Sequence, residues 1–170
     1  MIITQAIGKL ENPSSIENKN IDYLDFEWFE ATKKIQRKRT RAGEEVAIKF
    51  LKEGQRLYHH DILFEDENKL IVVNILPCEA IVISPKSLLE MGTVCYEIGN
   101  KHMPLFIQND EVLMPYEHPM FRWLEASGYN PEKREERLLN LLKSNVEPHS
   151  HASSGTSLFT KILNLASTKE

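Results

Sequence analysis

The sequence predicts a two-domain α+β protein, with a small all-β domain, a ferredoxin-like βαββαβ domain and a flexible C-terminal tail. Three observations support this prediction. Short apolar runs with period-two alternation follow one another up to Pro77. Beyond Pro77 the pattern changes to strand, helix, strand, strand, helix, strand, which is the order of the split βαβ fold, and the last segment is rich in small polar residues. We therefore expect domains at residues 1–76 and 77–142 and a tail at residues 143–170.

The first domain is expected to contain only strands. Val46, Ile48 and Phe50 alternate with other residues, which places them on one face of a strand. A turn that contains Gly43 separates this strand from the preceding one. Strands are expected at residues 1–6, 21–28, 32–41, 45–50, 62–64 and 70–75. Several short strands at this spacing suggest a small β-sandwich or barrel.

A cluster of basic residues lies in the predicted hairpin and consists of Lys33, Lys34, Arg37, Lys38, Arg39 and Arg41. A nucleic-acid patch would fit this charge. However, no aromatic side chains for base stacking are interleaved with the basic ones, acidic residues flank the run, and the formal net charge of the chain is −4. We therefore expect a solvated strand face or a protein-docking surface, and no nucleic-acid partner.

The second domain is expected to combine strands with two helices. The pair Asn109-Asp110 predicts a tight turn between two strands, and Pro119 and Gly128 mark the start and the end of the second helix. Residues 133–139 fit a closing strand, although their charge also allows a helix. The other elements are strands at residues 80–83, 105–108 and 111–114 and helices at residues 87–101 and 118–128.

The first of these helices carries an apolar stripe at gaps of three and four, formed by Leu88, Met91, Cys95 and Ile98. The same spacing continues to His102, just before Pro104 ends the helix. If the stripe is a seam between two copies of the chain, the two-fold axis brings two His102 side chains together. Neutral imidazoles suit nickel, copper and zinc, so this seam would hold a shared metal ion. The alternative is a buried, hydrogen-bonded core histidine.

The remaining histidines are weaker candidates. His149 and His151 form a His-x-His pair in the tail, which can add nitrogen ligands to a metal held elsewhere. A ligand number rising toward five or six would suit nickel(II) better than tetrahedral zinc(II). His118 is expected to cap the second helix. His59 and His60 are adjacent in a strand, so their rings should face opposite sides and remain surface groups.

Composition and motifs exclude several classes of function. The chain has 170 residues, of which 41% are hydrophobic, enough for one or two folded domains. Two cysteines and no signal-like N-terminus favour the cytoplasm, and no apolar run reaches membrane-spanning length. The sequence contains no nucleophile with a nearby base, no glycine-rich phosphate loop and no H-E-x-x-H zinc motif, so we expect no enzyme activity.

The segment around His102 resembles a known family. The run EIGNKH, which ends at His102, is similar to the GNRH segment of urease accessory protein E, with Lys101 in place of the usual arginine. The resemblance covers residues 1–151. It includes the GEEVAI strand, the LxxxDIL turn, the DEVLMPYEH segment and the histidine pair near the end of that range.

This resemblance implies a nickel metallochaperone rather than an enzyme. In such a protein the first domain binds protein, the second forms a homodimer, and His102 of both subunits holds Ni(II) between them. His149 and His151 are then auxiliary ligands and His118 a peripheral one, and zinc(II) or copper(II) can bind the same site. The nickel is passed to the urease apoprotein complex through the urease accessory GTPase.

Two further expectations complete this interpretation. The competing function is a metal-independent protein-binding or co-chaperone module, in which His102 is an ordinary core residue. The apolar residues between Leu158 and Ala166 recur at helical spacing and lie outside the usual family pattern, so we expect a docking helix for a partner there.

Overall fold

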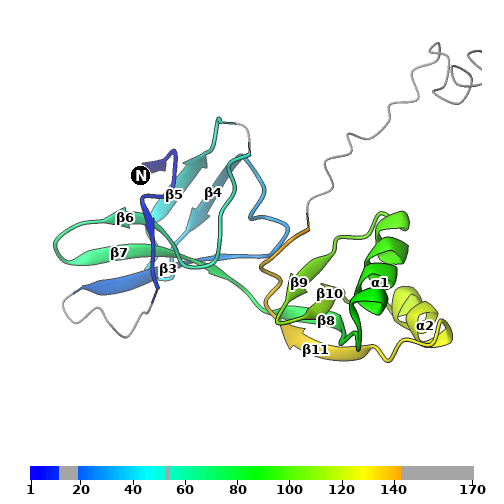
Figure 1. The fold of residues 1–170 in the computed structure, drawn as a ribbon. Coiled ribbons are helices and arrows are strands. Elements are labelled where there is room, and N and C mark those ends of the chain that lie inside the picture. The colour runs from blue at the N-terminus through cyan, green and yellow to red at the C-terminus, as the bar shows by residue number, and fades with distance from the viewer. Residues whose placement is uncertain (12–18, 53, 143–170) are drawn as a thin grey trace, which may run out of the picture.

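The computed structural model describes residues 1–11, 19–52 and 54–142. Figure 1 shows a part made of strands beside a part in which two helices lie against a sheet. The chain passes from one to the other between β7 (Lys69–Ile75) and β8 (Cys78–Ile83). This arrangement confirms the predicted two-part α+β fold. Neither helix in the described ranges is long and apolar enough to cross a membrane.

The described residues of the N-terminal part form two sheets that enclose one apolar core. The first sheet has the order β1-β5-β4 and the second the order β2-β6-β7-β3. The core between them includes Leu24, Phe26, Ile48, Phe50 and Val73, which are almost completely buried. In addition to β7, the strands are β1 (Ile2–Ile3), β2 (Gly8–Lys9), β3 (Asn20–Phe26), β4 (Ile35–Arg39), β5 (Glu45–Lys49) and β6 (Asp61–Glu65).

Two strands of this part are shorter than predicted. The segment expected as one strand at residues 1–6 contains only β1, because the chain crosses between the sheets there. β1 pairs in parallel with β5, whereas β2 pairs antiparallel with β6 in the other sheet. The strand expected at residues 32–41 begins only at Ile35, because Lys33 is part of a turn in which its N–H donates to the Glu30 carbonyl at 3.0 Å.

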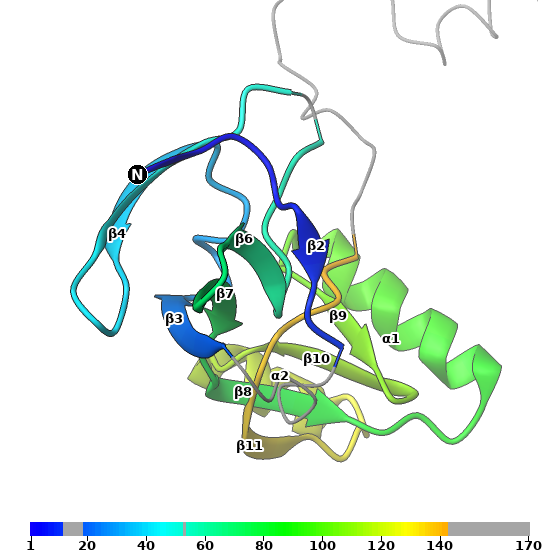
Figure 2. The same cartoon turned by 90° about the vertical axis from the view of Figure 1, so that its left-hand side faces the viewer.

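The C-terminal part is a ferredoxin-like unit, as predicted. Its antiparallel sheet has the order β11-β8-β10-β9, which is the strand order of a split βαβ fold. Figure 2 shows α1 and α2 on one side of this sheet. The elements after β8 are α1 (Leu88–Asn100), β9 (Phe106–Gln108), β10 (Glu111–Pro115), α2 (His118–Ala126) and β11 (Glu132–Glu136).

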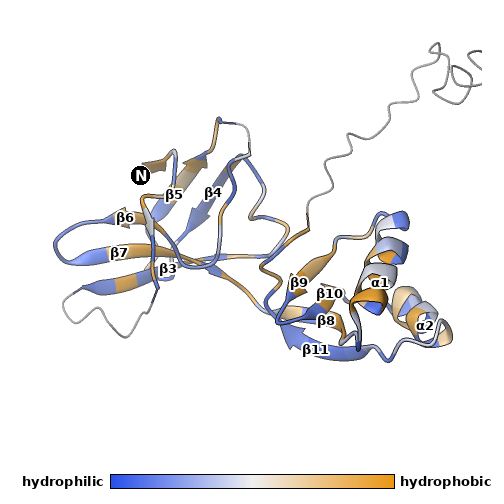
Figure 3. Cartoon of the chain, viewed as in Figure 1, coloured by the Kyte–Doolittle hydropathy of each residue, from blue (hydrophilic) through white to orange (hydrophobic). Residues whose placement is uncertain are grey.

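The ambiguous segment after Gly128 is a strand rather than a helix. β11 pairs antiparallel with β8 along five residues, and this pairing decides the conformation of a run that is mostly charged. Its charges are matched by neighbours on the same sheet: Lys133 lies 2.6 Å from Glu79, and Arg134 lies 2.5 Å from Glu111. Figure 3 shows that β11 and β4 are largely hydrophilic. Both are edge strands of their sheets, and charged edges limit unwanted strand pairing.

The two parts contact each other through the sheet face that the helices leave uncovered. The Trp28 ring packs edge-on against Phe106, with ring centroids 5.6 Å apart. The chain after β11 then runs back along this contact: Arg137 Nε donates to the Ile75 carbonyl at 3.0 Å. At its end, the Leu142 N–H donates to the Leu105 carbonyl at 2.7 Å.

Candidate metal site at the end of helix α1

Helix α1 begins one residue after the predicted start, because Ser87 is its cap and not its first helical residue. The Ser87 Oγ accepts a hydrogen bond from the Glu90 N–H at 3.1 Å, and the Glu90 carboxylate accepts one from the Lys86 N–H at 2.8 Å. The first bond satisfies a backbone donor that the first turn of a helix leaves unpaired, and the second ties the residue before the cap to the helix. The cap fixes where the helix starts.

The predicted apolar stripe of α1 is not the outward face of the helix. Ile98 is completely buried, and Met91 and Cys95 pack against the core beneath the helix together with Val94. Of the four predicted residues, only Leu88 is largely exposed. The stripe therefore covers the apolar side of its own sheet and is not the seam between two copies that its spacing suggested.

A second apolar face of α1 points outward. Leu88, Leu89 and Tyr96 keep 89%, 80% and 70% of their surface exposed. Together with Gly92 and Thr93 they line a shallow hollow, and this set of five residues is called the outer α1 face. Gly92 leaves open space above the helix, since no atom lies within 4 Å of the position of an added Cβ. The sequence carries the signal for this face in Leu89, Gly92 and Tyr96, at gaps of three and four, but the prediction missed it.

His102 lies directly after α1, in a backbone conformation that ends the helix. Its φ is +56°, in the left-handed region. Its N–H donates to the Gly99 carbonyl at 2.9 Å, and the Lys101 N–H donates to the Ile98 carbonyl at 3.0 Å. Glycine or asparagine usually occupies this position, because other residues pay roughly 1 kcal/mol or more for a left-handed conformation.

The His102 side chain is exposed, so the interpretation as a buried core histidine is wrong. No described residue forms a hydrogen bond with its ring. The preceding residue contacts α2, since the Lys101 Nζ lies 4.1 Å from the centre of the Trp123 ring. A strained residue with an unengaged polar side chain on a fixed helix end is a common sign of a functional position.

His118 does not cap helix α2, contrary to the prediction. The cap position belongs to Glu117, whose side chain forms no capping bond, and His118 is the first helical residue. The His118 side chain is exposed, with Nδ1 3.4 Å from the Tyr116 hydroxyl. The His118 ring therefore has one long polar contact, with Tyr116, and its second nitrogen is accessible.

His59 and His60 stack on each other instead of facing opposite sides. Their ring centroids are 3.9 Å apart. The prediction of alternation fails because His60 has a φ of +67°, which breaks the strand geometry. The His59 Nδ1 accepts a hydrogen bond from the Ile75 N–H at 3.1 Å. Burial, together with the neighbouring His60, lowers the pKa of His59 to about 4. This ring is therefore neutral, and its Nδ1 is already used as a hydrogen-bond acceptor.

The described residues of one chain do not assemble a complete metal site. No three side chains of histidine, cysteine, aspartate or glutamate gather there in an arrangement that could hold a metal ion. Burial raises the pKa of the Cys95 thiol, which disfavours the thiolate that binds metals. His149, His151 and the segment from Leu158 to Ala166 lie outside the described residues.

Comparison with known proteins places both parts of the chain. Family models match it in two regions: the N-terminal domain of UreE urease accessory protein over residues 3–76 and the C-terminal domain of the same protein over residues 79–155. The urease accessory protein UreE of Flavobacterium johnsoniae is 61% identical over 166 residues, which cover 98% of this chain and 99% of that protein. The UreE proteins of Actinobacillus pleuropneumoniae and Helicobacter pylori strain P12 are 49% and 42% identical, over 82% and 75% of this chain and 74% and 76% of their own length.

Proposed function

The chain belongs to the family of UreE urease accessory proteins, and from this premise we propose that it carries nickel(II) for the assembly of the urease metal centre. The family is one of accessory chaperones in urease maturation, not of enzymes. In this proposal Ni(II) is the cargo, and the chain binds it loosely enough to pass it on.

The observation that carries the proposal is the exposed His102 at the end of α1. Its imidazole is accessible and forms no hydrogen bond with a described residue. Glycine would adopt the left-handed backbone with less strain, so the backbone conformation does not explain why a histidine stands here. An imidazole nitrogen is a suitable ligand for Ni(II), and also for zinc(II) and copper(II). His102 is therefore the ligand that we assign to the described part of the chain.

We further propose that a second copy of the chain completes the site. The outer α1 face supports this, since Leu88, Leu89 and Tyr96 are unusually exposed for apolar side chains on a helix. Packing two such faces around a two-fold axis would bury them and repeat His102 once per subunit. Gly92 would let the two helices approach closely.

Two imidazoles alone leave most positions around Ni(II) open. The histidines of the tail, His149 and His151, are proposed to supply further nitrogens, and His118 to form a peripheral site. Ligands of this kind can be exchanged one at a time, which suits a carrier, whereas a closed and rigid ligand shell would hold the ion. The recipients that we propose are the urease apoprotein complex and the urease accessory GTPase, in the cytoplasm.

Titration calorimetry with Ni(II) on full-length, untagged protein tests the assignment. We expect His102→Ala to weaken the tightest binding by at least about tenfold, since it removes one nitrogen ligand per subunit. The matched control, His118→Ala, removes an exposed histidine from α2 and should leave that binding event in place. Unchanged affinity and stoichiometry in His102→Ala would reject the assignment and favour a metal-independent protein-binding module.

A truncation after Asn145 separates the tail from the dimer. We expect this shortened chain to bind Ni(II) more weakly while its mass in sedimentation remains that of a dimer. Loss of the dimer would show that the tail holds the subunits together instead of supplying ligands.

A further inference from the structure

Strand β4 presents an unpaired backbone edge. The Phe50 N–H donates to the Lys34 carbonyl and the Thr40 N–H to the Glu44 carbonyl, at 2.7 and 3.0 Å. Both pairs continue the antiparallel register of β4 and β5, so every second residue between them, Gln36 and Lys38, points its backbone groups toward β5. The backbone groups of Ile35, Arg37 and Arg39 therefore point away from β5. No described residue receives a hydrogen bond from their N–H groups, and β4 is the last strand of its sheet.

The same three residues share one face of the sheet. Ile35, Arg37 and Arg39 are exposed, whereas Gln36 and Lys38 are partly buried. Across the strand pair, Arg37 lies opposite Ala47, and Ile35 lies opposite Lys49. A hollow beside this face is lined by Met1, Arg37, Lys38, Arg39, Glu45, Val46 and Ala47.

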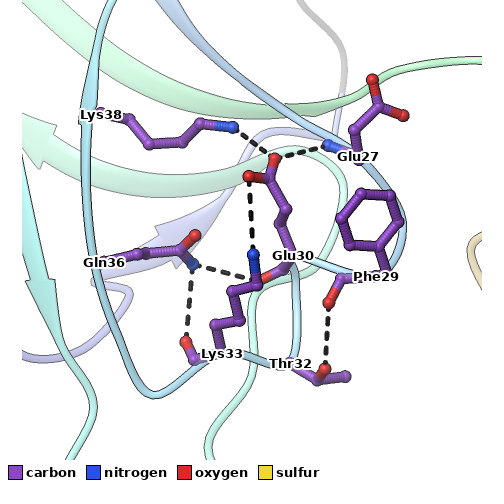
Figure 4. Close-up of polar contacts among 7 residues, drawn as sticks. All are labelled: Glu27, Phe29, Glu30, Thr32, Lys33, Gln36 and Lys38. Carbon is purple, nitrogen blue, oxygen red and sulfur yellow. Dashed lines mark hydrogen bonds and ion pairs between the residues drawn. The ribbon is translucent and has the colours of Figure 1, made fainter.

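The buried side of β4 is fixed by the turn that precedes it (Figure 4). The Glu30 carboxylate pairs with Lys38 and lies 3.9 Å from Lys33. The Gln36 amide donates to the Glu30 carbonyl at 3.0 Å. These contacts hold β4 extended. Because the backbone of β4 is already ordered before a strand is added, the entropic cost of binding is lower.

Most of the basic run is neutralised inside the chain. Lys33 and Lys38 are used by Glu30, Arg39 pairs with Glu45 at 2.6 Å, and Arg41 pairs with Asp25 at 2.9 Å. Among the described residues, no carboxylate lies within ion-pair distance of Arg37 or Lys49. The exposed face beside the open edge therefore keeps a positive charge that a negative partner can match.

We propose that β4 binds an extended, acidic segment of a partner protein, which adds to the sheet as an antiparallel strand. The backbone of this segment pairs with Ile35, Arg37 and Arg39, and its acidic side chains lie beside Arg37 on the exposed face of the sheet. The basic edge repels a second β4, which disfavours pairing between two copies of the chain. This interaction surface goes beyond the proposed nickel site, since it lies in the other part of the molecule.

A fluorescein-labelled octapeptide of alternating glutamate and valine tests the proposal by fluorescence anisotropy with the full chain. In an antiparallel added strand, residues whose side chains lie over Arg37 also turn their N–H groups toward β4. N-methylation of the glutamates should therefore weaken binding at least about tenfold, because it removes backbone hydrogen bonds. N-methylation of the valines should leave binding within about twofold.

Charge reversal gives a second, independent test. We expect Arg37→Glu to weaken binding of the unmethylated peptide at least about tenfold. The matched control is Arg122→Glu, which reverses an exposed arginine on α2 and should change the affinity by less than about twofold. Arg37→Glu should also leave nickel binding unchanged, which keeps this proposal distinct from the nickel site.

Several results would overturn the proposal. Equal binding of the two N-methylated peptides would show that charge alone attracts the peptide, and equal binding by Arg37→Glu would place the peptide elsewhere. Tighter binding of a single-stranded RNA octamer than of the peptide would show that the basic face serves nucleic acid. Pairing of β4 with a second copy would appear as self-association that Arg37→Glu changes.

Discussion

Two turns in this molecule contain a histidine in the left-handed conformation, His60 and His102, and their rings are engaged differently. At residues 59–60 the ring of the left-handed His60 stacks on His59, which accepts the Ile75 N–H and is kept neutral by burial. At the end of α1, His102 has the same backbone conformation, but its ring is exposed and forms no hydrogen bond with a described residue. The comparison teaches that a ring already engaged by the backbone serves stability, whereas an unengaged one is available to a ligand. The predictions below test this difference.

The largest effect is expected on the outer α1 face, which forms the subunit interface in the proposed dimer. Leu89→Asp should leave the chain monomeric and weaken nickel binding at least about tenfold, because an apolar interface cannot readily bury a carboxylate. Sedimentation velocity and nickel titration measure the two effects. Leu51→Asp, at a leucine of the other part with 76% of its surface exposed, should remain a dimer. A dimeric Leu89→Asp protein would place the subunit interface elsewhere.

The next effect concerns the engaged ring. His59→Ala leaves the Ile75 N–H without its acceptor and should lower the free energy of unfolding by about 2 kcal/mol. His59→Gln offers an oxygen acceptor in a similar place and should lose less. Urea titration measures both values. Nickel affinity should not change in either variant, and a change would show that the two turns are coupled.

For His102, whose ring is unengaged, we expect substitution by glycine to change the free energy of unfolding in the opposite direction. His102→Gly should raise the free energy of unfolding by about 1 kcal/mol, because glycine adopts the left-handed conformation without strain. His102→Ala retains the strain and should bring no gain, although both variants lose the nickel ligand. If His102→Gly were less stable than the natural chain, its ring would have a structural role.

The last effect is a pH dependence of stability that belongs to His59. Its pKa is lowered from 6.5 to about 4 in the folded chain, so between these values the unfolded chain binds more protons than the folded one. Stability from this group is therefore present above pH 6.5 and is lost as the pH falls toward 4. Urea midpoints measured across this range should fall less steeply in His59→Gln. Parallel curves would assign the slope to other groups.

Local sequence signals predicted most of the fold correctly. Helix α1 was placed to within one residue of its start, and Pro119 stands in the first turn of α2. Asn109 and Asp110 take positive φ angles between β9 and β10, as a tight turn requires. These features succeed because a few neighbouring residues determine them.

The failures involve information that is not local. Both sides of α1 carry apolar residues at helical spacing, so spacing could not decide whether Ile98 or Leu89 faces the core. The extended conformation of the charged strand β11 depends on pairing with β8. The stacking of His59 on His60 depends on the positive φ angle of His60. The position of His102 was predicted, whereas its exposure and left-handed backbone were not.

The bond between Leu142 and Leu105 has a consequence for the histidines that follow in the chain. It anchors Leu142 at Leu105, which lies three residues after His102 and directly before β9. His149 follows seven residues later, so the covalent chain keeps its Cα atom within about 25 Å of that anchor. A ligand on so short a tether is present at an effective concentration on the order of millimolar. In the proposed nickel site, each subunit would thus supply its own additional imidazoles without a search through solution.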